Sequence, residues 1–209
     1  MNWKLYFCLP FLLVGVLTNF STAQSGFGLR AGANASYITF SGYTIKPGFH
    51  AGGYAKIALS KKLYLQPELI FSQKGGQTKK SKEKKYYNPF TQQLYKREIY
   101  TLDYIDINLP LRLNIWKGFH ALAGPQFSVL VQDLFKYNNG YQERDTYNFS
   151  DARRIDFGIH AGIGYEFKNG LLIAFRGDAG FLKILTGYDS KNLVASASLG
   201  YTIFGKRVR

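Results

Sequence analysis

Cysteine, proline and histidine are scarce in this 209-residue chain, which has 1 Cys, 6 Pro and 3 His. The single cysteine, Cys8, lies in the apolar N-terminal stretch, so a chain that starts after this stretch has neither disulfides nor a catalytic thiol. Beyond that stretch no apolar run is long enough for a transmembrane helix. A mature chain that spans a membrane must therefore do so as a closed β-barrel, because only helices and barrels satisfy their backbone in lipid.

Acidic residues are also few, since 13 Asp and Glu face 27 Lys and Arg and leave a formal net charge of +14. Such a basic protein binds nucleic acid in some cases and an anionic membrane surface in others. Aromatic residues make up 17% of the chain and there are 22 glycines, a composition typical of a folded β-rich domain and not of a disordered one. The location of the bases decides between the two kinds of partner.

The N-terminus predicts export. Lys4 precedes an apolar segment that ends in small residues at Ala23, the pattern of a secretory signal peptide. An uncleaved anchor helix is the alternative, but the apolar run is short and contains Pro10. We expect residues 1–23 to be a signal peptide that is removed and residues 24–209 to form the mature domain.

The clearest structural pattern lies between Arg153 and Leu185. Apolar side chains take every second position along RRIDFGIHAGIGYEF, and polar residues or glycine lie between them. Period two is that of a β-strand with one apolar and one polar face. Asn169-Gly170 favours a type I′ hairpin turn, after which LLIAFRGDAGF repeats the alternation. Each arm reaches the roughly 9–11 residues that a tilted strand needs to cross a bilayer.

The same alternation recurs along the chain and predicts eight strands. The other six are 27–38, 47–59, 63–72, 101–115, 119–132 and 192–204. The connections after the second, fourth and sixth strands are short, and the others are longer. Short periplasmic turns and long extracellular loops characterise bacterial outer-membrane barrels. We therefore predict an all-β, eight-stranded antiparallel up-and-down transmembrane β-barrel in the outer membrane, with a soluble eight-stranded barrel as the alternative.

The inward faces of these strands carry equal numbers of opposite charges. The predicted inward residues are the bases Arg30, Lys56, Arg112, Arg154 and Arg176 and the acids Glu68, Asp106, Asp156, Glu166 and Asp178. Buried charges need partners, and these residues can form a lumen ion-pair network. Because an eight-stranded barrel is just wide enough for side chains, we expect a packed lumen without an aqueous pore.

Most of the excess positive charge therefore lies outside the lumen, and its largest cluster is in a long loop at residues 75–98. Its candidate binding residues are Lys79, Lys80, Lys82, Lys84, Lys85, Tyr86 and Tyr87. An extracellular position favours anionic surface partners, such as lipopolysaccharide phosphates or acidic glycans, over nucleic acid. Envelope proteins are further candidate partners, and a loop that only interacts with solvent is the alternative. A second long loop is expected at 134–152.

The chain resembles the PorT-like small outer-membrane β-barrel proteins of Bacteroidetes. The resemblance is carried by GLRAGANAS, GFHAGGYAKIALSKKLYLQPELIFSQKG, YIDINLPLRLN, ALAGPQFSVLV, IHAGIGYEFKNGLLIAFRGDAG and ASLGYTIF, which together cover nearly all of residues 24–209. It implies a part in a secretion or gliding apparatus. No residue here matches a functional signature of that family.

The sequence offers little for catalysis. His50, His120 and His160 face inward but at different heights, so we expect no metal site. Ser36 and His50 form the one candidate pair for a lipid A-modifying hydrolase. We predict a monomeric, non-catalytic barrel without cofactors that acts as an accessory or interaction protein. The hydrolase and a small-solute pore are the alternatives.

Overall fold

The computed structural model describes residues 26–39, 42–78, 81–82, 95–138, 143–146, 153–184 and 190–204. The predicted signal peptide, residues 1–23, lies outside the described residues. No helix in the described ranges is long and apolar enough to cross a membrane.

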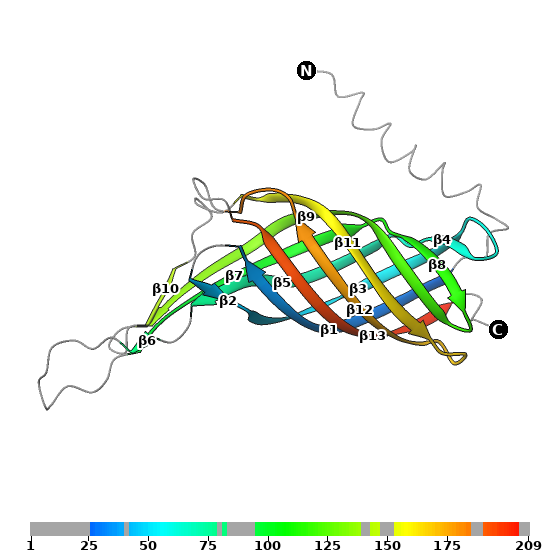
Figure 1. Ribbon diagram of the computed structural model, residues 1–209, viewed down its shortest axis with the longest axis horizontal. Coiled ribbons are helices and arrows are strands. Elements are labelled where there is room, and N and C mark those ends of the chain that lie inside the picture. Colours follow the sequence, from blue (N-terminus) through cyan, green and yellow to red (C-terminus); the bar gives the residue numbers. More distant parts are fainter. Residues whose placement is uncertain are drawn as a thin grey trace, which may run out of the picture.

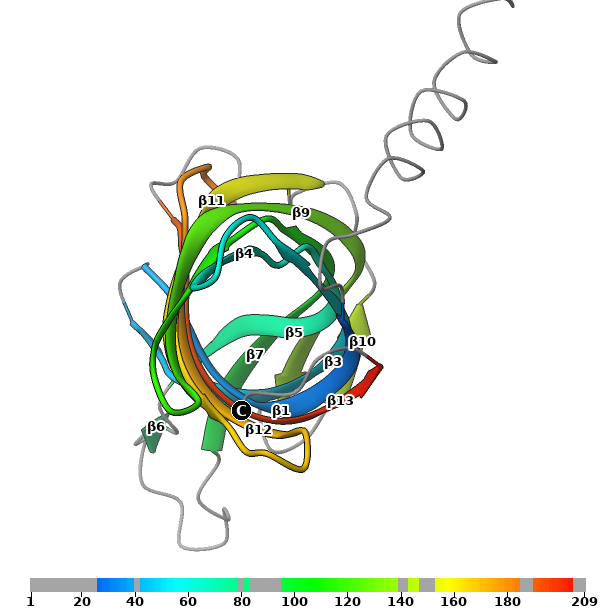
Figure 2. The same cartoon turned by 90° about the vertical axis from the view of Figure 1, so that its right-hand side faces the viewer.

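The described strands close into one antiparallel barrel (Figures 1 and 2). The eight predicted strands correspond to β1 (Gly26–Ile38), β3 (Lys46–Ala58), β4 (Leu63–Leu65) with β5 (Glu68–Thr78), β7 (Tyr95–Asn108) with β8 (Leu111–Trp116), β9 (Phe119–Asn138), β11 (Ile155–Glu166), β12 (Leu171–Gly180) and β13 (Asn192–Phe204). Each pairs with the next along the chain, and β1 pairs with both β3 and β13, which closes the ring. The predicted fold class is confirmed.

Two prolines divide two of the predicted strands. Pro67 lies between β4 and β5, and Pro110 lies between β7 and β8. Each proline interrupts its strand because it has no backbone N–H to donate to the ladder. The two breaks lie side by side, since the Gln66 N–H donates to the Pro110 carbonyl at 2.9 Å. The barrel wall therefore stays continuous across both interruptions.

The tight turns share one end of the barrel, which we call the hairpin end; the opposite end is the loop end. The predicted type I′ turn at Asn169-Gly170 is wrong, because Gly170 has a positive φ of 95° but Asn169 does not. The Phe167 N–H donates to the Leu171 carbonyl and the Gly170 N–H to the Phe167 carbonyl, the pattern of a type I turn followed by a glycine bulge. Lys117 and Gly118 both have positive φ, as a type I′ turn requires.

Three strands run farther than predicted at the loop end. β5 continues to Thr78, β7 begins at Tyr95 and β9 continues to Asn138, so parts of both predicted long loops are paired strand. Short strands β2 (Tyr43–Thr44), β6 (Ser81–Lys82) and β10 (Glu143–Thr146) add to this region. Figure 1 shows the resulting sheet projecting beyond the barrel.

A bulge in β9 changes the faces of its second half. Asp103 pairs with Gln132 but Tyr104 pairs with Leu130, which leaves Val131 as an extra residue. Gln132 has the same parity as the inward-facing His120 and would face the lumen in a regular strand. It is exposed because of the bulge, and Asp133 is buried instead at 2% exposure.

The barrel wall is apolar outside and polar inside. Outward side chains such as Leu69, Ile163 and Phe175 are about 60% exposed, at 58%, 63% and 59%. Most charged and amide side chains of the strands are buried. This inversion of a soluble core suits a wall surrounded by lipid.

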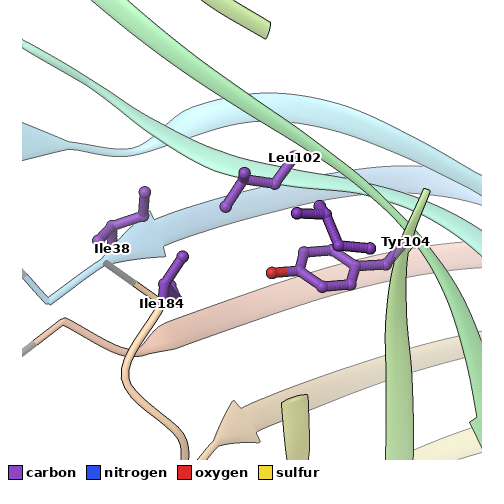
Figure 3. Packing of buried hydrophobic residues seen from close by; sticks show 5 residues of the cluster. Ile38, Leu102, Tyr104 and Ile184 are labelled. Carbon is purple, nitrogen blue, oxygen red and sulfur yellow. The ribbon is translucent and has the colours of Figure 1, made fainter. Parts of the chain in front are cut away.

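An apolar cluster fills the lumen at the loop end (Figure 3). We call this cluster the plug; its members are Ile38, Leu102, Tyr104, Leu130 and Ile184. Ile184 follows β12, and its backbone bonds to Arg153 and Ser190 hold it over the mouth. Ile38, Leu102 and Ile184 are at most 2% exposed. The plug separates the polar lumen from solvent at this end.

Inward glycines make room for the large lumen side chains, as the alternation of β11 predicts. A Cβ at Gly164 would lie 2.6 Å from Nε2 of His120, and one at Gly162 would lie 2.6 Å from Cγ of Arg176. Both distances are too short for real contacts, so these positions exclude side chains.

We expect Gly164→Val to destabilise the barrel by about 1–3 kcal/mol, because the new methyl groups would overlap His120 and the Ile173 carbonyl. Ala161→Val, on the exposed face of the same strand, is the control and should change stability little. Urea unfolding in detergent micelles, followed by the shift between folded and unfolded bands on a gel, measures both. Equal stability of the two variants would contradict the packing described here.

Candidate functional site

Glu68 is the centre of the lumen ion-pair network. Its carboxylate accepts two bonds from Nη1 of Arg176 at 2.9 and 2.7 Å and lies 2.9 Å from Nη2 of Arg30. Gln66 and Asn108 donate to the same two oxygens. The Glu68 side chain is 0% exposed. One carboxylate on β5 thus bridges two guanidinium groups from β1 and β12, which are separated in the wall only by β13.

Glu166 forms a second centre closer to the hairpin end. It lies 2.6 Å from Nζ of Lys56 and 2.6 Å from Nη2 of Arg112, and it accepts a bond from Thr202 at 2.9 Å. Gln66 connects the two centres, because its amide nitrogen donates to Glu68 and its oxygen accepts from Arg112 at 3.2 Å. The network therefore continues across the lumen.

A third ion pair involves a residue that sequence reasoning missed. Nζ of Lys74 lies 2.9 Å from Asp106 and 4.9 Å from the ring centre of Tyr104, and Lys74 is 2% exposed. We expected the strand to end near residue 72, but β5 runs to Thr78 and carries Lys74 inward. The sequence does contain a signal for this position, because Lys74 has the same parity as the inward residues Glu68 and Ser72.

Arg154 is the one predicted lumen charge that lies elsewhere. It is exposed and precedes β11, so its predicted inward position is wrong. Its carbonyl accepts from the Leu130 N–H at 2.7 Å, which places it at the height of the plug. The lumen at this height is lined by apolar side chains, and a charged group is costly to bury there.

Asp156 and Asp178 border a small polar cavity of about 10 Å³ together with Lys74, Gln126, Ser128 and Asn192. This volume accommodates about one water molecule. Oδ1 of Asp178 is 3.8 Å from Nδ1 of His160, and Oδ1 of Asp156 accepts from the Leu182 N–H. The cavity is far too small for a solute that would cross the barrel.

The histidines are buried and lie apart. His50, His120 and His160 are 1–3% exposed. Across the described ranges, no three His, Cys, Asp or Glu side chains converge as metal ligands do.

The structure does not bring Ser36 and His50 together. The Ser36 hydroxyl donates to the Lys46 carbonyl at 3.1 Å. His50 instead lies 2.8 Å from Oγ of Ser198 and 2.7 Å from Oδ1 of Asn34. Serine, histidine and asparagine in this order resemble a hydrolytic triad. All three side chains are at most 5% exposed and lie beneath the plug, so a lipid ester does not reach Ser198.

Comparison with known proteins agrees with this geometry. Residues 12–186 match the family described as outer membrane protein beta-barrel domain. The chain belongs to this family. A search of curated proteins gives no match.

Solved structures of other proteins share the fold at low sequence identity. Neisserial surface protein A (NspA) is 12% identical with a TM-score of 0.54, covering 86% of this chain and 99% of that one. Ail, the attachment invasion locus protein of Yersinia pestis, crystallised with the heparin analogue sucrose octasulfate, is 10% identical with a TM-score of 0.51, covering 86% and 99%. The family match supports an outer-membrane location.

The predicted surface-binding residues cannot be placed. Lys79, Lys80, Lys84, Lys85, Tyr86 and Tyr87 lie outside the described residues, and Lys82 is described only as part of the backbone of β6. Their role stays a prediction.

We expect Glu68→Gln to destabilise the barrel by about 3–5 kcal/mol, because Arg30 and Arg176 would lose the acid that they share while remaining buried. The double variant Glu68→Gln/Arg176→Met should also be destabilised. Its loss in free energy of unfolding should be smaller than the sum of the losses of the two single variants by at least about 1 kcal/mol. Urea unfolding in micelles measures the cycle. Strict additivity would show that the pair is not energetically coupled.

Proposed function

We propose that this protein is a non-catalytic interaction protein of the outer membrane, whose barrel anchors a β-sheet that projects outside the cell toward partners. The observation that carries the proposal is the continuation of β5, β7 and β9 past the plug. Strands that only had to cross the bilayer would end at the mouth of the barrel.

The projecting sheet has its own packing and its own edges. The rings of Tyr100 on β7 and Phe135 on β9 lie 5.8 Å apart, and Tyr100 also contacts the plug. In the described part of the chain, β10 pairs with β9 and β2 pairs with β5, and each forms an edge. Strand edges offer backbone donors and acceptors to an extended partner segment. Ile45, beside β2, is 59% exposed.

The lumen argues against the two other functions. A pore for small solutes needs a continuous aqueous path, but ion pairs at Glu68 and Glu166 and the apolar plug occupy the interior. A hydrolase needs access to its nucleophile, and Ser198 is 3% exposed within the lumen. A binding role for the outer sheet is compatible with both features.

The resemblance to PorT-like proteins supports an envelope protein as the partner, as part of a secretion or gliding apparatus. Lipopolysaccharide or acidic glycans are the alternative partners, given the net charge of +14. Ail, which has a similar barrel, has been crystallised with a heparin analogue. Sucrose octasulfate is therefore a suitable competitor in the test below.

Cysteine labelling tests both orientation and partner. If Cys8 leaves with the signal peptide, Ile45→Cys and Trp116→Cys each introduce a single thiol. The two native side chains are exposed to a similar extent, 59% and 61%, at opposite ends of the barrel. We expect a membrane-impermeant benzophenone maleimide to label Ile45→Cys in intact cells and Trp116→Cys only after permeabilisation. Illumination should then link Ile45→Cys to one defined envelope protein.

The partner should disappear when residues 79–94 are replaced by a short Gly-Ser linker, and the folded gel band should remain. Labelling of Trp116→Cys in intact cells would reverse the proposed orientation. Absence of any protein adduct at Ile45→Cys would argue against a protein partner. An adduct that contains no protein and that sucrose octasulfate abolishes would favour a polyanionic glycan.

A further inference from the structure

Three neighbouring strands present an uninterrupted apolar surface to the outside. The outward positions from Ile155 to Tyr165 on β11, from Leu171 to Phe181 on and after β12, and from Leu193 to Ile203 on β13 hold only aliphatic, aromatic, alanine and glycine residues. No acidic side chain faces outward in these described stretches. In an outer-membrane barrel, such a surface faces the acyl chains.

At the loop end, a basic residue lies next to each of the three strands, at a position that continues the outward-facing alternation of that strand. Arg153 precedes β11, Lys183 follows β12 and Lys191 precedes β13. Arg153 and Lys183 are exposed and Lys191 is half-buried. Neighbouring strands are ~5 Å apart, so the three side chains occupy a short arc of the rim. We call Arg153, Lys183 and Lys191 the cationic rim.

Backbone hydrogen bonds fix this arc. The Arg153 N–H donates to the Ile184 carbonyl and the Ile184 N–H donates to the Ser190 carbonyl, each at 2.8 Å. The Lys191 N–H donates to Oγ1 of Thr39 at 2.8 Å. Hydrogen bonds therefore hold the backbones of Arg153 and Lys191, and Lys183 directly precedes Ile184, whose backbone bonds to the segments before β11 and β13.

Aromatic side chains lie directly below the cationic rim. The rings of Phe157 and Phe181 are 6.1 Å apart, and both side chains are 46% exposed. The Phe181 N–H donates to the Phe157 carbonyl, which keeps the two rings on adjacent strands. Aromatic rings at this height typically mark the boundary between acyl chains and headgroups. The cationic rim thus lies where headgroup phosphates would be.

We propose that Arg153, Lys183 and Lys191 bind the phosphate of an outer-leaflet lipid of the lipid A type, a phosphorylated and acylated glucosamine disaccharide. Cations at a bilayer surface attract anionic headgroups, and Arg and Lys form charge-assisted hydrogen bonds with phosphate. The contiguous apolar surface favours a lipid over a free phosphate. One lipid molecule can contact this surface with its acyl chains and the three cations with its phosphate. This site is independent of any partner that binds the projecting sheet.

Native mass spectrometry of the full-length protein in mixed micelles tests the site. The probes are lipid A and the same lipid after enzymatic dephosphorylation. The rim variant is Arg153→Gln/Lys183→Gln/Lys191→Gln. The control Lys61→Gln/Lys62→Gln/Lys168→Gln loses the same charge from exposed turns at the hairpin end. Both variants should keep the gel shift of a folded barrel, which separates loss of binding from loss of folding.

We expect the unmodified protein to retain phosphorylated lipid A over the dephosphorylated form, and the rim variant to lose this preference by on the order of 10- to 100-fold. The control should keep it. Equal retention of both lipids by the unmodified protein, or equal losses in the rim variant and the control, would overturn the proposal. Displacement of lipid A by millimolar inorganic phosphate would show an anion site without lipid specificity and would also overturn it.

Discussion

Charge neutralisation inside a narrow lumen is the constraint on which the rest of this structure depends. An eight-stranded barrel has an interior just wide enough for side chains, so charges that point inward must neutralise one another. Glu68 and Glu166 each do so by bridging two cations from different strands. These contacts cross the barrel and fix the relative heights of strands that are distant in sequence. The polar interior is in this respect the structural core of the protein.

The exterior follows from the same arrangement. With charges paired inside, the wall can present an apolar surface to lipid, and the plug of Ile38, Leu102, Tyr104, Leu130 and Ile184 ends the polar lumen at one side. Beyond the plug, β5, β7 and β9 no longer enclose a lumen and become a projecting sheet. The molecule thus combines a closed anchor with a surface that is available for binding. The features on which the proposed function rests lie at the loop end, and the interior supports them.

Strict alternation made most of the fold and much of the lumen predictable. Parity alone placed Glu68, Glu166 and Arg112 inside, because each lies within a regular strand. It failed where regularity ends: Lys74 lies past the expected end of its strand, Arg154 lies at the apolar plug, and the bulge at Val131 exchanges the faces of Gln132 and Asp133. Partners were not predictable, since the contact of His50 with Ser198 depends on two strands distant in sequence.

The closed interior is the central claim, and conductance measures it most directly. We predict that the protein, purified as the folded form and inserted in planar bilayers, passes no ionic current above that of the lipid alone, because ion pairs and the plug occupy the lumen in the part of the chain that the structure describes. Stable, stepwise conductance from the folded protein would show a continuous aqueous path through the lumen. That result would contradict the packed ion-pair network and with it the account of a barrel that serves as an anchor.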